Sequence, residues 1–126
     1  MELRVDLKAK PFYLNDEQIG WVKETIEGMT FDEKIGQLFL FMSMGTEPAS
    51  VRIDAMEKIG LRPCGLLLRG ASSKNIREKI ADFQNFYPIP LFIAGDLERG
   101  ASNMIEDGTA CGHELEISAT NDPELA

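Results

Sequence analysis

The sequence has few of the residues that build metal centres and disulfide frameworks. It contains two cysteines and one histidine in 126 residues. Cys64 lies in an apolar run and Cys111 in a polar stretch, and their spacing fits neither a metal centre nor a disulfide framework. His113 has no second imidazole and no nearby serine or cysteine in a catalytic arrangement, so we expect a surface or packing role for it. We therefore expect no metal, no cofactor and a reduced, intracellular chain.

Long hydrophobic runs and an excess of positive charge are also missing. No apolar segment approaches the roughly 18 residues of a membrane helix, and residues 1–10 contain no apolar core of a signal peptide. The chain carries 13 Lys and Arg against 21 Asp and Glu, a formal net charge of −8. Because this charge repels phosphate groups, we expect neither nucleic acid nor membrane as a partner, and we expect a cytoplasmic location.

What the sequence does have is a 44% hydrophobic content, enough for a globular core, and clear starts of helices. Asn15 precedes acidic residues that suit the positive end of a helix, and apolar residues then recur at helical spacing over 16–28. Thr30 and Glu33 have the spacing of a capping box, which predicts a second, short helix.

Two further helices are indicated by their ends. Pro48 suits the first turn of a helix, and Gly60 can end that helix in a left-handed conformation. Ser73 can cap the next helix, and Pro88 stops it because proline cannot continue a helix.

Between these helices lie three short apolar runs, residues 38–42, 64–68 and 91–94. Each is too short for an independent helix and suits a strand that is buried on both faces. Strands that alternate with helices predict parallel βαβ units and an α/β fold.

Three parallel strands leave a face or an edge of the sheet uncovered, and a closed eight-stranded barrel needs about 250 residues. The chain is therefore a fragment, or it forms an oligomer if it is complete, or its tail adds strands. Residues 121–124 have the pattern of a cap and first turn of another helix, and the sequence stops there, which favours a fragment.

Candidate functional residues follow the apolar runs, because sites in parallel α/β folds lie at the carboxyl ends of strands. Asp96 directly follows the third run, together with Glu98 and Arg99, and Arg69 follows the second run. A carboxylate that is held in place accepts strong hydrogen bonds from sugar hydroxyls. The alternative is that Asp96 caps a turn or the following helix.

Asp96 and Glu98 also allow an interpretation as a catalytic pair. If one strand continued through both, their Cα atoms would be about 6.6 Å apart, near the roughly 6.5–9.5 Å between the carboxyl groups of inverting glycosidases. However, an acid and a base must flank the substrate from opposite sides, so an ion pair of Glu98 with Arg99 or another cation fits better. The glycines at 95 and 100 have no Lys-Ser or Lys-Thr after them and do not form a phosphate loop.

With these residues identified, the sequence resembles the N-terminal barrel of family 3 glycoside hydrolases, particularly the β-N-acetylhexosaminidase-like branch. The resemblance implies that the chain holds the first three βα units of a (β/α)8 TIM-type barrel. Residues 1–29 would then be an N-terminal extension and helix, and 30–126 the βα units and the start of the next helix. The matching stretches occur in the order of the family: residues 29–39, 64–69, 90–100, 108–109 and 119–126.

The resemblance assigns Asp96 to the hydroxyls of the sugar in the −1 subsite. Glu98 and Gly100 match the D-x-E-x-G pattern of the family, whereas Arg99 stands in place of a common glycine. Met104 stands where many hexosaminidases have an arginine, and residues 110–112 replace the usual Phe-Pro after Gly-Thr.

The family cleaves β-glycosides with retention, and its nucleophilic aspartate and its acid/base lie later in the barrel. The resemblance therefore implies part of a hydrolase for β-N-acetylglucosaminides or β-glucosides, with a carbohydrate substrate. The segment would have no catalytic residue of its own and no activity alone. A non-catalytic α/β module for carbohydrate binding or assembly is the alternative, and a nucleotide-binding domain is disfavoured because the phosphate loop is missing.

Overall fold

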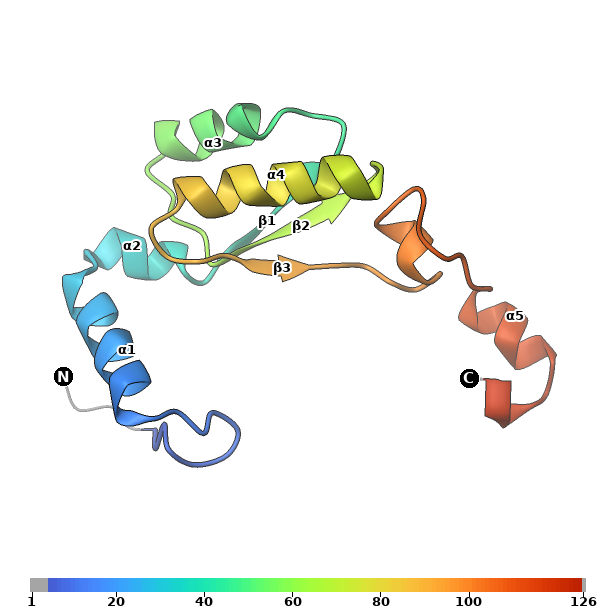
Figure 1. Cartoon of the computed structure of the whole chain (residues 1–126), viewed down its shortest axis with the longest axis horizontal. Helices are drawn as coiled ribbons and strands as arrows, with labels where there is room; N and C mark the ends of the chain where they lie inside the picture. Colours follow the sequence, from blue (N-terminus) through green and yellow to red (C-terminus); the bar gives the residue numbers. More distant parts are fainter. Residues whose placement is uncertain (1–4, 126) are drawn as a thin grey trace.

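The structure, a computed structural model, describes residues 5–125. Its centre is a sheet of three parallel strands in the order β1–β2–β3. The helices that connect these strands, α3 and α4, lie on the same side of the sheet (Figure 1). The predicted α/β fold with parallel strands is confirmed. The bounds are β1 (Leu40–Met44), α3 (Ala49–Lys58), β2 (Gly65–Arg69), α4 (Ser73–Phe86) and β3 (Phe92–Ala94).

The core lies between the sheet and the two helices. Leu66 and Leu68 of β2 are fully buried, and Phe83 of α4 is fully buried opposite them. The Phe83 ring packs edge-on against Phe41 of β1, with ring centroids 5.5 Å apart. Because successive side chains of a strand point to opposite faces, only alternate residues of each strand reach this core.

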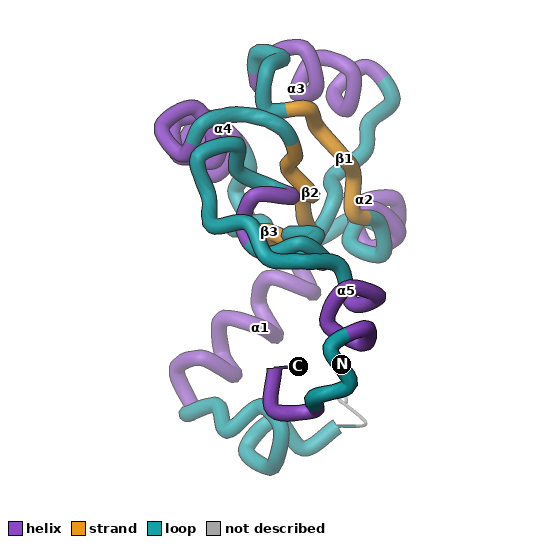
Figure 2. The backbone as a smooth tube through the Cα atoms, turned by 90° about the vertical axis from the view of Figure 1, so that its right-hand side faces the viewer, coloured by secondary structure: helices purple, strands orange, loops and turns teal. Residues whose placement is uncertain are grey.

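The other face of the sheet is uncovered in the part of the chain that the structure describes. Leu40 and Met42 of β1 are 46% and 52% exposed, and Phe92 of β3 is 76% exposed. The prediction that the apolar runs are buried on both faces is therefore wrong for this face, since α3 and α4 both pack on the other (Figure 2). The expectation that three parallel strands leave a face uncovered is confirmed.

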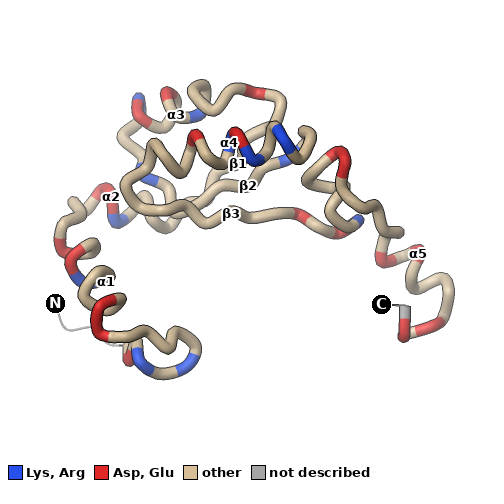
Figure 3. The backbone as a smooth tube through the Cα atoms, in the orientation of Figure 1, with Lys and Arg blue, Asp and Glu red and all other residues tan. Residues whose placement is uncertain are grey.

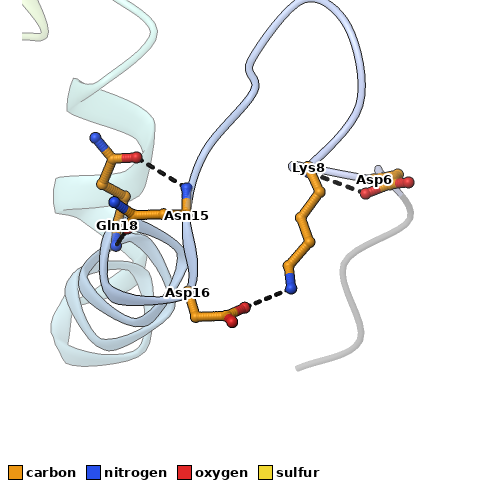
Figure 4. A network of polar contacts seen from close by, with 5 residues as sticks. All are labelled: Asp6, Lys8, Asn15, Asp16 and Gln18. Atoms are coloured by element: carbon orange, nitrogen blue, oxygen red, sulfur yellow. Dashed lines mark hydrogen bonds and ion pairs between the residues drawn. The ribbon is translucent and has the colours of Figure 1, made fainter.

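Two helices precede the sheet, and local capping explains both. Asn15 and Gln18 form a capping box at the start of α1 (Asp16–Gly28), and Lys8 pairs with Asp16 over 2.6 Å (Figure 4). Thr30 and Glu33 form the predicted capping box of α2 (Phe31–Gly36). The predicted bounds of α1 and the predicted start of α2 are confirmed.

Several boundaries differ from the prediction by one or two residues. The run 38–42 was expected to be a strand, but the amides of Leu38 and Phe39 still bond to the carbonyls of Ile35 and Gly36, so β1 begins at Leu40. Pro48 is the N-cap of α3 and lies just before its first turn.

At α4, the cap is Ser72 and not Ser73. The Ser72 hydroxyl accepts a bond from the amide of Asn75, three residues on. Gly60 has the expected left-handed conformation after α3, with a φ of 69°.

After β3 the chain forms a short 3-10 turn, η1 (Ala101–Asn103), a helix α5 (Glu114–Ala119) and a second 3-10 turn η2 (Pro123–Leu125). Helix α5 was not predicted, because it is short and His113 caps it without a side-chain bond. The helix start expected over 121–124 forms η2 instead. Residues 1–4 of the predicted N-terminal extension and residue 126 lie outside the described residues.

Acidic residues are spread along the chain, from α1 and α2 through α3 and α4 to the loop after β3 and the end of the chain, as Figure 3 shows. Of the helices that the structure describes, none has both the length and the apolar character needed to cross a membrane.

Candidate functional site

The carboxyl ends of the parallel strands bring two predicted residues together. Asp96 follows β3, and Arg69 is the last residue of β2. The Asp96 Oδ2 lies 3.6 Å from the Arg69 Nη1, and the two side chains are 30% and 40% exposed, respectively. Met44 is the partner of Arg69 in the β1–β2 register, so it occupies the same edge. The predicted proximity of strand ends therefore applies to Asp96 and Arg69.

This ion pair leaves polar groups available to a ligand. Its separation is longer than a hydrogen bond, and pairs that are this exposed contribute about 1 kcal/mol or less. A guanidinium has five N–H donors, and an ionised carboxylate has about four acceptor positions. Sugar hydroxyls donate and accept hydrogen bonds, so they can use both partners.

Glu98 and Arg99 lie beyond β3, in the turn that follows Asp96. Both are exposed, and the turn closes with a bond from the Gly100 amide to the Leu97 carbonyl. Strand β3 ends at Ala94 and does not continue through Asp96 and Glu98. The condition on which the catalytic-pair interpretation depended is therefore not met.

Side-chain and backbone contacts hold the backbone of this loop. The Asn103 side-chain amide donates to the Asp96 carbonyl over 3.1 Å. The sulfur of Met104 lies only 2.7 Å from the position that a Cβ on Gly95 would occupy, so the Met104 side chain packs directly on the Gly95 backbone. The loop thus folds back over its own beginning at Asp96.

The same loop is tied to the end of β2. The Gly70 amide donates to the Met104 carbonyl over 3.1 Å, and the Glu106 amide donates to the Ala71 carbonyl over 3.0 Å. Ala71 and Ile105 form a parallel bridge, so this pairing continues beyond the end of β2. Arg69 directly precedes these bonds, and Asp96 is joined to the same loop through the Asn103 side chain.

Sequence reasoning missed Asp107, which joins this loop to the start of α4. Its Oδ1 accepts from the Ser73 amide over 2.5 Å, and its Oδ2 accepts from the Ser73 hydroxyl over 2.7 Å. These two bonds hold the pKa of the Asp107 carboxyl below its usual range. The two residues are 34 positions apart, so no local motif indicates the contact.

Sequence reasoning also missed Lys79, which fixes the loop after β1. Lys79 of α4 is only 5% exposed, and its Nζ donates to the carbonyls of Met44 and Glu47. Burial lowers the pKa of Lys79, while the Glu47 carboxylate acts in the opposite direction. Glu47 is itself paired with Arg52 over 2.9 Å.

The other candidates lie elsewhere. His113 is the N-cap of α5, and its Nδ1 lies 3.8 Å from the Glu114 carboxylate, in agreement with the expected surface position. Within residues 5–125, no group of three or more His, Cys, Asp or Glu side chains is arranged to hold a metal ion.

An apolar pocket of about 450 Å³ lies between α1 and the amino ends of the strands, away from Asp96. Its lining includes Trp21 of α1 and Phe92 at the start of β3.

Fold and strand ends define the class of protein: a parallel α/β unit that presents an acidic and a basic side chain at the carboxyl edge of its sheet. No protein-family model matches the chain. However, it is 33% identical over 116 residues to a β-N-acetylglucosaminidase/β-glucosidase of Cellulomonas fimi, and this match covers 92% of the chain and 20% of that protein.

Solved structures agree with this match. A β-glucoside phosphorylase, BglX, bound to 2FGlc superposes with a TM-score of 0.77 at 36% identity, over 92% of this chain and 21% of that one. Another structure of BglX superposes with a TM-score of 0.73 at 35% identity, over 92% of this chain and 20% of that one. The chain spans about one fifth of the length of the relatives it matches, and its resemblance to part of the family 3 glycoside hydrolases is confirmed.

Proposed function

We propose that the chain is the first three βα units of a barrel enzyme that acts on β-glycosides, either β-N-acetylglucosaminides or β-glucosides. In this proposal Asp96 binds hydroxyls of the sugar in the −1 subsite. The reaction proceeds with retention, and the nucleophile and the acid/base come from other parts of the barrel. The single observation that supports the proposal best is the half-buried Asp96–Arg69 pair at the carboxyl edge of the sheet, in a chain homologous to β-glycoside enzymes.

The roles follow from the chemistry of the two groups. The Asp96 carboxylate accepts hydrogen bonds from two neighbouring hydroxyls, and Arg69 both orients the carboxylate and donates to a sugar oxygen. Glu98 and Arg99 are exposed on the adjacent turn and are assigned to the outer part of the same subsite.

The uncovered face of the sheet supports the barrel part of the proposal. Leu40, Met42 and Phe92 form an apolar surface opposite α3 and α4, as expected for the inward face of a barrel whose helices all lie outside. The same surface would also suit a non-catalytic assembly module, which buries it against a second copy.

Replacement of Asp96 in the full-length protein tests the proposal. We expect Asp96→Ala to lower kcat/KM for aryl β-glucosides and aryl N-acetyl-β-glucosaminides by about 100-fold or more, since each of two bonds to a charged group contributes about 1.5–3 kcal/mol. Each assay is run with and without inorganic phosphate, because the relatives include both a glycosidase and a phosphorylase.

The matched control is Asp82→Asn, which removes an exposed carboxylate from α4. It should leave kcat/KM unchanged. Equal activity of Asp96→Ala and wild type would rule out the sugar-binding role. A protein that is inactive on all these glycosides, yet dimerises through the uncovered face, would favour the assembly module.

A further inference from the structure

We propose that Asp107 is a positioning residue for the sugar-binding edge: by clamping Ser73 at the start of α4, it sets the geometry of Asp96 and Arg69. This inference rests on the proposed function of that edge. It concerns a residue that contacts neither member of the ion pair through any bond described above, so its influence must pass through the loop.

The clamp has the geometry of a stiff connection. Both carboxylate oxygens of Asp107 are used, one by the Ser73 amide and one by the Ser73 hydroxyl. Two bonds to a single residue fix the orientation of the carboxylate as well as its distance. Ser72, the preceding residue, caps the same helix through its own hydroxyl, so the Ser72–Ser73 segment is held from both sides.

From Asp107 the loop runs back to the ion pair through a short series of bonds. Glu106 and Met104 pair with the Ala71 and Gly70 backbone, directly after Arg69. Asn103 then holds the carbonyl of Asp96. Release of Asp107 would therefore loosen the segment that carries both charged partners.

Electrostatics favours an anion at this position. The first amides of α4 have no acceptor within the helix, and the positive end of the helix dipole attracts a carboxylate. Arg77, one turn further on, adds an attraction in the same direction. Because the pKa of Asp107 is lowered, the clamp is ionised above about pH 4 and is lost as the pH falls through this lowered pKa.

Three variants of the full-length protein test the proposal. Asp107→Ala removes both bonds and should lower kcat/KM on aryl β-glycosides by about 10-fold to 100-fold, since misplacement of binding groups by an ångström has effects of this size. Asp107→Asn should keep most of the wild-type activity. The Asn oxygen can accept from the Ser73 backbone amide, and the Asn nitrogen can donate to the Ser73 hydroxyl. Ser73→Ala loses one of the two bonds, so its kcat/KM should lie between the values of Asp107→Ala and Asp107→Asn.

Two readouts separate positioning from general stability. Hydrogen–deuterium exchange should rise in Asp107→Ala over peptides covering residues 68–74 and 95–107. The advantage of wild type over Asp107→Asn should be present at neutral pH and disappear as the pH falls through the lowered pKa of Asp107. Asp82→Asn again serves as the control that changes an exposed carboxylate on α4.

The outcomes distinguish this inference from the proposed function. Loss of activity in Asp96→Ala together with full activity in Asp107→Ala would overturn the positioning role only. Unchanged activity in Asp96→Ala would overturn the proposed function. If hydrogen–deuterium exchange in Asp107→Ala then rises only beside residue 107, the structural role of Asp107 is overturned as well. Failure of Asp107→Asn to recover activity would also count against the clamp.

Discussion

Lys79 provides the sharpest test of how the carboxyl end of β1 is held. Lys79→Met replaces the methylene stem with an apolar side chain of similar length and removes the ammonium that bonds to the Met44 and Glu47 carbonyls. Bonds from a charged donor contribute about 1.5–3 kcal/mol each, and the burial of the charge offsets several kcal/mol. We expect a net loss of about 1–3 kcal/mol in the free energy of unfolding.

Lys79→Ala also removes three buried methylene groups, each contributing about 0.8 kcal/mol, so it should lose about 2 kcal/mol more than the methionine variant. Urea denaturation of wild type and both variants measures these differences. Lys74→Met is the matched control, because Lys74 lies on the same helix with its side chain 81% exposed. It should change the free energy of unfolding by less than about 0.5 kcal/mol.

The pH dependence gives a second check on Lys79. Its pKa is lower in the folded state than in the unfolded state, so the unfolded state binds more protons in the alkaline range. The stability of wild type should therefore gain a contribution as the pH rises from the folded pKa toward about 10.4, and Lys79→Met should lack it. A methionine variant as stable as wild type at neutral pH would refute the stabilising role of the two carbonyl bonds.

Two further predictions concern packing. Phe83→Ala removes a fully buried ring that packs against Phe41. In urea denaturation it should lower the free energy of unfolding by about 3–5 kcal/mol. A loss under about 1 kcal/mol would contradict this packing. Gly45→Ala would bring a Cβ to 2.5 Å from the Ala71 Cβ and should destabilise by about 1–3 kcal/mol. A Cβ added at Gly20 in α1 has no atom within 4 Å, so Gly20→Ala should stabilise the protein by about 0.5–1 kcal/mol. Melting temperatures that shift in the same direction for both glycine variants would contradict this contrast.

Helices α1 to α4 were predicted well because their ends depend on neighbouring residues, whereas the short helix α5 was missed. The box of Thr30 with Glu33 lies within four residues, so the pattern alone identifies it. At α1 the pattern placed the helix start at Asn15, and the structure adds the reciprocal bond with Gln18. The start of β1 was predicted less well. Leu38 is as apolar as the strand residues, yet its amide belongs to the turn after α2, and hydrophobicity does not distinguish these two cases.

The candidate site was predictable only where it follows from strand order. Asp96 and Arg69 are found because each follows an apolar run and the ends of parallel strands meet at one edge. Asp107 and Lys79 act on residues 34 and 35 positions away, respectively, and their partners are backbone groups or a serine. Such contacts depend on how the loops fold over the sheet, for which the sequence has no periodic pattern.

The uncovered sheet face has a consequence for work with the isolated chain. Phe92 and Met42 are more than half exposed, and β1 and β3 are edge strands of the described sheet with unpaired backbone groups. Apolar surface next to open strand edges promotes aggregation. When the chain is produced by itself, its melting temperature should therefore depend on protein concentration, and its solubility should improve when Phe92 is replaced by a charged residue such as lysine.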